Sequence, residues 1–161
     1  MALYRTISMS FWTDSKVVDE FTPEDRYFYL YLFTNPHTNL CGCYEISIRQ
    51  MANELGYAKD SVENLIKRFE SVHNVIRYSS VGKEILLLNW YKYNWTKSEK
   101  FRVPLIKEIE QVKDEYPNEE RAQIESLVMS GIQYLVEMAT GVVKGTVGAE
   151  GATGATGATG A

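Results

Sequence analysis

The apolar positions between residues 48 and 69 follow a helical spacing that is broken once, near Gly56. Residues three or four apart share one face of a helix, so the pattern predicts two helices with one buried face each. Ala52 leaves room for a close helix crossing, and Gly56 suits a helix end that needs a positive φ. The segment 48–67 is therefore predicted to be a helix-turn-helix. Its apolar positions are Met51 and Leu55 in the first helix and Val62, Leu65, Ile66 and Phe69 in the second.

The second of these helices has polar side chains at the positions that would face outwards. In helix-turn-helix proteins this face often lies in the major groove of DNA. Ordinary packed helix pairs can show the same spacing, so the pattern favours DNA binding without requiring it. The outward residues are Lys59, Asp60, Ser61, Glu63, Asn64 and Lys67.

Two β-prone runs, 75–78 and 84–88, come directly after the second helix. The linker 79–83 between them contains Gly82, which can take a positive φ, so the two runs predict a β-hairpin. Lys83 would then lie at the tip of the hairpin. The alternative is a generic hairpin with a solvated lysine.

Upstream, the chain predicts one more helix and one more strand. Thr22 is a good N-cap for a helix that has Pro23 at its first position and ends before Pro36. Residues 43–46 predict a short strand, after which Ser47 can cap the next helix. The order helix, strand, helix, helix, hairpin is that of a winged helix. The predicted fold class is therefore α+β, a winged helix-turn-helix domain.

Shorter signals flank this unit. Asp14 is a plausible cap for a short helix over 16–21. The aromatic segment 89–95 closes the predicted domain. Aromatics interleaved with lysines can stack on unpaired bases, but at a strand end they more often fill a core or a dimer interface. We favour the core or interface interpretation.

The composition divides the chain into three parts. Residues 1–103 form the predicted winged-helix DNA-binding domain. In residues 104–140, Pro104 is expected to open a helix over 105–115, and a second helix follows with an apolar stripe that needs a partner. This helical extension is predicted to pack on the domain or to pair between subunits. Residues 141–161 repeat Gly, Ala and Thr and predict a disordered low-complexity tail.

Charge is unevenly distributed along the chain, whose net charge is −4. Residues 59–102 hold nine Lys or Arg against five Asp or Glu, whereas residues 106–161 hold four against nine. This modest local excess suits weak phosphate contacts by the predicted recognition helix and hairpin. No apolar run approaches the roughly eighteen residues of a membrane span, and residues 1–5 do not begin a signal peptide. We expect a cytoplasmic protein with no membrane partner.

Candidate catalytic chemistry is sparse. Cys41 and Cys43 have no further cysteine to complete a zinc set, and we interpret them as reduced thiols on a strand. His37 and His73 fall in predicted loops without a paired nucleophile, and no phosphate-binding glycine loop is present. The expectation is a protein that is not an enzyme and that uses no metal and no cofactor.

Four runs of this sequence are distinctive: Ser10–Asp14, Thr22–Pro36, Cys41–Ile46 and Leu88–Trp95. They resemble the N-terminal domain of phage replisome organisers, relatives of the DnaD replication-initiation proteins. The resemblance covers roughly residues 3–115. It implies a winged helix that binds DNA near a replication origin, self-associates and helps assemble the primosome with a replicative helicase or helicase loader, in the bacterial host cytoplasm if the protein is phage-encoded. Longer members carry a second helical domain, which is not recognisable in this sequence. DNA binding and oligomerisation are therefore the family functions that the resemblance covers best.

The predicted DNA contacts begin at the N-terminal turn of the second helix. Its side chains would meet base edges or phosphates, and Lys83 would reach an adjacent phosphate. Asp60 and Glu63 oppose this, because an acid facing DNA is costly unless it accepts from a cytosine amino group. With three to five phosphate contacts per copy, the dissociation constant for non-specific DNA should lie near the weak end of the usual range, roughly 10⁻⁴ to 10⁻⁶ M. Useful affinity then requires several copies bound to one DNA. The predicted DNA-binding residues are Lys59, Ser61, Asn64, Lys67, Arg68 and Lys83.

Two other functions remain open from the sequence. Many winged helices are transcriptional regulators, which bind palindromes near promoters. The domain could instead be a protein-interaction module that binds no DNA, which the acidic net charge and the pair Asp60 and Glu63 favour slightly.

Overall fold

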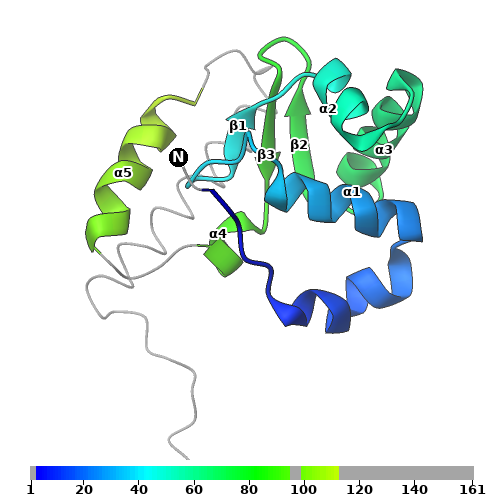
Figure 1. Cartoon of the computed structure of the whole chain (residues 1–161), viewed down its shortest axis with the longest axis horizontal. Helices are drawn as coiled ribbons and strands as arrows, with labels where there is room; N and C mark the ends of the chain where they lie inside the picture. The colour runs from blue at the N-terminus through cyan, green and yellow to red at the C-terminus, as the bar shows by residue number, and fades with distance from the viewer. Residues whose placement is uncertain (1–2, 95–98, 113–161) are drawn as a thin grey trace, which may run out of the picture.

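A computed structural model describes residues 3–94 and 99–112 of the 161-residue chain. These residues form an α+β structure of helices around a small antiparallel sheet, as predicted (Figure 1). The elements in chain order are a 3₁₀ turn η1 (Met9–Thr13), a π-helical turn η2 (Lys16–Glu20), α1 (Pro23–Thr34), β1 (Cys43–Glu45), α2 (Ile48–Leu55), α3 (Lys59–Ser71), β2 (Ile76–Ser79), β3 (Glu84–Leu87), α4 (Trp90–Asn94) and α5 (Glu99–Glu110).

The three strands pair in the order β1-β3-β2, and both pairs are antiparallel. Strand β3 is central, with Leu86 opposite Cys43 of β1 and Ile85 opposite Tyr78 of β2. The predicted hairpin is present, and its linker spans residues 80–83. Its positive φ falls on Lys83, at 50°, and not on Gly82, so that prediction was wrong.

The predicted helix signals are confirmed by hydrogen bonds at the helix ends. Thr22 and Asp25 form a reciprocal capping box at the start of α1, and the Ser47 hydroxyl accepts from the backbone N–H of Gln50 at the start of α2. Gly56 ends α2 with a φ of 77°. These local contacts set where α1 and α2 begin and where the chain turns towards α3.

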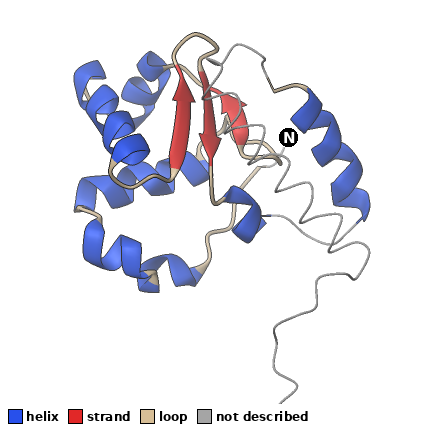
Figure 2. Ribbon diagram, turned by 180° about the vertical axis from the view of Figure 1, so that it is seen from behind, coloured by secondary structure: helices blue, strands red, loops and turns tan. Residues whose placement is uncertain are grey.

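The larger apolar core lies between the sheet and the helices α1, α2 and α3 (Figure 2). Side chains alternate across a strand, so Ile85 and Leu87 of β3 enter this core while Leu86 points to the other face. On that other face α5 supplies the fully buried Leu105. Both views show α5 on the opposite side of the sheet from α2 and α3.

The segment after β3 differs from the prediction. Residues 90–94 form the one-turn helix α4 where a strand end was expected, and α5 begins at Glu99 with Pro104 inside it. Phe101 and Leu105 lie one turn apart, and both pack in the apolar cluster between α5 and the sheet, which also contains Leu86. This packing accounts for the helix on the N-terminal side of Pro104.

Part of the predicted organisation lies outside the described residues. The second helix of the 104–140 extension, the tail 141–161 and Trp95 fall in this category. Within the described residues, no helix is long and apolar enough to cross a bilayer.

Candidate nucleic-acid interface

Helix α3 has one face in the core and one face in solvent. Its apolar residues are buried against α1, α2 and the sheet. Four of the six predicted DNA-binding residues lie exposed on the same helix: Lys59, Ser61, Asn64 and Lys67. Asn64 and Lys67 follow Asp60 at intervals of four and three residues, so these three side chains line the centre of the outer face.

The two acids of α3 have different surroundings. The Lys59 ammonium lies 3.5 Å from the Glu63 carboxylate, one turn away. The charge of Lys59 is therefore partly balanced within the helix, which weakens it as a phosphate ligand. Asp60 is exposed, and none of the ion pairs or side-chain hydrogen bonds within the described part of the chain uses its carboxylate.

Arg68, also predicted to bind DNA, lies apart from this set. Its guanidinium forms an ion pair with Asp25 of α1, whose side chain is 1% exposed. The other Asp25 oxygen accepts from the Thr22 backbone N–H at 3.0 Å and faces Nε2 of buried His73 at 3.1 Å. Arg68 therefore joins α3 to the start of α1. The sequence offered no signal for a contact between residues that far apart.

The electrostatics of Asp25 explain why this buried acid is tolerated. Burial by itself would raise the pKa of Asp25, but hydrogen bonds from Thr22, His73 and Arg68 and the Arg68 charge outweigh it and lower the pKa below its usual 3.8. Asp25 is thus held as a carboxylate. Nε of Arg68 and Nδ1 of His73 are buried without hydrogen-bond partners among the described residues.

The hairpin places Lys83 beside the start of α2. The backbone N–H of Ile46 donates to the Lys83 carbonyl at 2.7 Å, and the Tyr78 hydroxyl donates to the Ile46 carbonyl at 3.1 Å. Arg49, in the first turn of α2, is exposed near this junction. Sequence reasoning missed Arg49, although its place between the apolar positions of α2 put it on the outer face.

Helix α2 is also anchored to α1. Glu54 accepts from the Tyr31 hydroxyl, and its other oxygen lies 2.6 Å from Nε2 of His37. The Tyr27 hydroxyl donates to the Leu55 carbonyl at 3.1 Å. Burial and then the Glu54 carboxylate raise the pKa of Tyr31 above its ordinary range, so the phenol stays a hydrogen-bond donor. The orientation of α2, and of α3 after it, is thereby fixed relative to α1.

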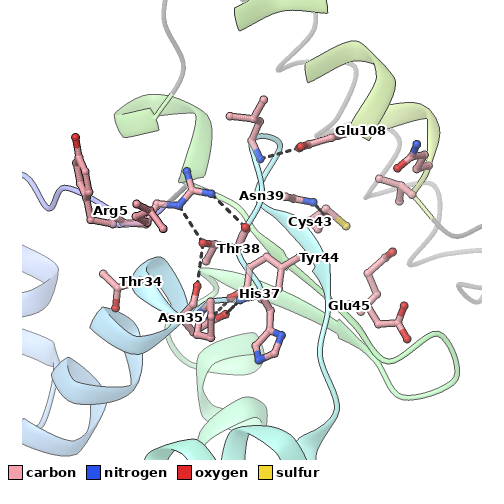
Figure 3. A pocket seen from close by; sticks show the side chains of 17 residues that line it. Arg5, Thr34, Asn35, His37, Thr38, Asn39, Cys43, Tyr44, Glu45 and Glu108 are labelled. Carbon is pink, nitrogen blue, oxygen red and sulfur yellow. Dashed lines mark hydrogen bonds between the residues drawn. The ribbon is translucent and has the colours of Figure 1, made fainter. Parts of the chain in front are cut away.

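A polar cavity of about 840 Å³ lies on the α5 side of the sheet (Figure 3). Arg5 donates to the hydroxyl and the carbonyl of Thr38, while the Glu108 carboxylate accepts from the backbone N–H groups of Leu40 and Cys41. These side chains hold the chain segments together and form no nucleophile–base pair. Across the described residues, no group of three or more His, Cys, Asp or Glu could hold a metal ion.

The described aromatic side chains after β3 are divided between the core and the surface. Trp90 is buried, stacks on Phe33 with ring centroids 5.5 Å apart, and donates from its indole to the Leu40 carbonyl. The Arg5 guanidinium covers its ring at 5.6 Å. Trp90 is therefore not available to stack on bases, whereas Tyr93 is exposed.

Comparison of the chain with models of protein families, with curated proteins and with solved structures finds no match. The geometry of α2, α3 and the hairpin therefore carries the functional argument.

Proposed function

We propose that residues 23–88 form a winged helix-turn-helix that binds duplex DNA. The observation that carries the proposal is the element order α1-β1-α2-α3-β2-β3 together with the sheet order β1-β3-β2. In that arrangement α3 would be the recognition helix and the linker 80–83 the wing. The exposed polar face of α3 supports this assignment.

The proposed contacts follow from where the exposed side chains lie. Helix α3 ends near the first residue of β2, which is the end of that strand away from the hairpin tip. The first half of α3 therefore lies towards the hairpin tip and the start of α2 (Figure 1). Ser61 and Asn64 would meet base edges in the major groove. Lys67, Lys83 and Arg49 would contact phosphates on either side of the groove. Arg68 is omitted because its guanidinium is paired with Asp25.

The proposed biological role is replication initiation. Three phosphate contacts per copy give weak binding, so useful affinity needs several copies on one DNA. The resemblance to phage replisome organisers supports self-association near an origin, in a bacterial cytoplasm, with a replicative helicase or its loader as a further partner. Exposed apolar side chains at Tyr4, Met9 and Trp12 offer surface for self-association.

The test is fluorescence anisotropy of the full chain with labelled duplex and single-stranded DNA over a salt series. We expect a preference for duplex and a log–log salt slope of about −3, because each neutralised phosphate contributes roughly −0.9. A preference for single strands would contradict the recognition-helix geometry. The absence of binding at low salt, with protein shown to be folded, would refute the proposal.

One observation favours a second candidate, a protein-interaction module. On α3 the charges of Lys59 and Lys67 are balanced by Asp60 and Glu63, so the exposed face of the helix is close to neutral. A face that binds protein needs no positive excess. The same salt series distinguishes the two candidates, because only DNA binding releases counterions from phosphates.

A further inference from the structure

We infer that α3 makes the proposed DNA binding base-specific, with the Asp60 carboxylate accepting a hydrogen bond from the amino group of a cytosine. This inference rests on the proposed function and names the class of DNA site that the same interface would select. It starts from a conflict, because an acid at the centre of a DNA-facing helix opposes binding to phosphates.

The structure separates Asp60 from the other acid of α3. The Glu63 charge is met by Lys59 at 3.5 Å, along the edge of the outer face. Asp60 is exposed in the first turn, and no ion pair or side-chain hydrogen bond of the described residues engages its carboxylate. Asp60 therefore retains a full set of acceptor positions on the surface that would enter the groove.

The chemistry of the major groove limits what such an acceptor can meet. Guanine offers two acceptors there and thymine offers an acceptor and a methyl group, so both leave an aspartate unpaired or repelled. Adenine has an N6 amino donor, but the N7 acceptor beside it repels a carboxylate. Cytosine offers its N4 amino donor, and Asp or Glu accepting from that donor is a recurring pair. An unpaired acid thus acts against wrong sequences, which is one of the two ways a protein obtains specificity.

Asn64 extends the expected site by one base. It lies four residues after Asp60, about 6 Å further along the helix axis, whereas stacked bases are about 3.4 Å apart. Asn can bind the N6 and N7 edge of adenine with two hydrogen bonds. The two side chains would therefore select a cytosine and an adenine one or two base steps apart.

A structural role for Asp60 is the competing explanation. Ala58 provides no side-chain cap for α3, and an acid in the first turn favours the positive end of the helix dipole. A role confined to the helix would make Asp60→Asn lower the melting temperature without changing base preference. The two roles therefore differ in a measurement that does not depend on folding alone.

The experiment selects duplexes from a randomised library with the full-length chain and with three variants. Asp60→Asn removes the charge and keeps the shape, and Asn64→Ala removes the expected adenine contact. Asp19→Asn is the matched control, because Asp19 is an exposed acid on η2, outside the helices α2 and α3. Circular dichroism confirms that each variant is folded before selection.

We expect the wild-type chain to enrich one cytosine, with on the order of tenfold weaker binding when that C·G pair is replaced by T·A. Asp60→Asn should reduce this difference below about twofold and raise affinity for unselected duplex, since the repulsion is gone. Asn64→Ala should relax only the neighbouring position, and Asp19→Asn neither. Duplex binding without cytosine enrichment, or enrichment that survives Asp60→Asn, would overturn the inference alone. Failure to bind any duplex would overturn the proposed function with it.

Discussion

The two faces of the three-stranded sheet are built differently. One face lies against α1, α2 and α3 and buries large side chains such as Phe28, Phe69 and Ile85. Among the described residues, the other face buries a small cluster under α5. Its buried members are Cys41, Cys43, Leu86 and Leu105.

Because of this difference, we expect the α1–α3 face and the α5 face to open at different free energies. Buried apolar area is the main source of folding free energy, so the α1–α3 face should open only on global unfolding. Within residues 3–94 and 99–112, the α5 face depends on few apolar contacts and on hydrogen bonds such as those from Leu40 and Cys41 to Glu108. We expect α5 to detach at a lower free energy while the proposed DNA-binding face stays intact.

The largest expected effect is at Gly42, which lies directly against the Trp90 side chain of the larger core. Gly42 and Gly56 share a φ of 77°, but an added Cβ at Gly42 would overlap the Trp90 side chain, whereas one at Gly56 would have no atom of the described residues within 4 Å. Gly42→Ala should lower the free energy of unfolding by about 3 kcal/mol or more, since overpacking adds to backbone strain. Gly56→Ala should lower it by only about 1 kcal/mol. Urea denaturation measures both, and equal losses would contradict the Trp90 contact.

A smaller effect is expected at Asp25, which joins α1 to α3. Asp25→Asn should lower the free energy of unfolding by about 2 kcal/mol at pH 7, because Arg68 and His73 lose a charged partner. The pKa of Asp25 is depressed, so its contribution is complete above its ordinary value and is lost as the pH falls through the folded-state value. When the pH is lowered from 7 to below about 4, the variant should therefore lose less free energy of unfolding than wild type.

The control for this pH experiment is Glu24→Gln, an exposed acid in the same turn of α1. It should leave both the stability and its acid dependence nearly unchanged. If Glu24→Gln and Asp25→Asn behave alike in acid denaturation followed by circular dichroism, the buried ion pair is not the source of the pH dependence.

The smallest effect concerns the docking of α5. Glu108→Gln should weaken the hydrogen bonds to Leu40 and Cys41 by about 1 kcal/mol, and so speed the reaction of Cys41 with a thiol reagent roughly fivefold. Burial raises the pKa of Cys41 to about 11, which keeps the thiol unreactive while α5 is docked. Glu110→Gln on the same helix is the control and should not change the rate. Equal rates in both variants would show that Glu108 does not hold α5.

Features that depend on neighbouring residues in the sequence could be predicted. Local signals were sufficient for Thr22, Ser47 and Gly56, because a cap or a helix end depends on residues a few positions away. Helix spacing likewise placed the exposed face of α3.

Long-range contacts could not be predicted in this way. Arg68 was assigned to the DNA contacts, and its partner Asp25 is 43 positions away. Pro104 was expected to start a helix, but the packing of Phe101 beside Leu105 extends α5 in front of it. Helix spacing could place Arg49 on the outer face of α2, but the pairing of Ile46 with Lys83, which brings the hairpin to the start of α2, could not be predicted.

The most direct test of the proposed DNA-binding face compares two double variants with equal loss of charge. Lys67→Ala with Lys83→Ala removes lysines from α3 and the hairpin, and Lys100→Ala with Lys107→Ala removes lysines from α5 on the opposite side of the sheet. In duplex titrations over a salt series, the first pair should flatten the salt slope by about two and weaken binding, while the second pair should leave both near wild type. Equal effects from the two pairs would show that duplex binding does not use the face formed by α3 and the hairpin.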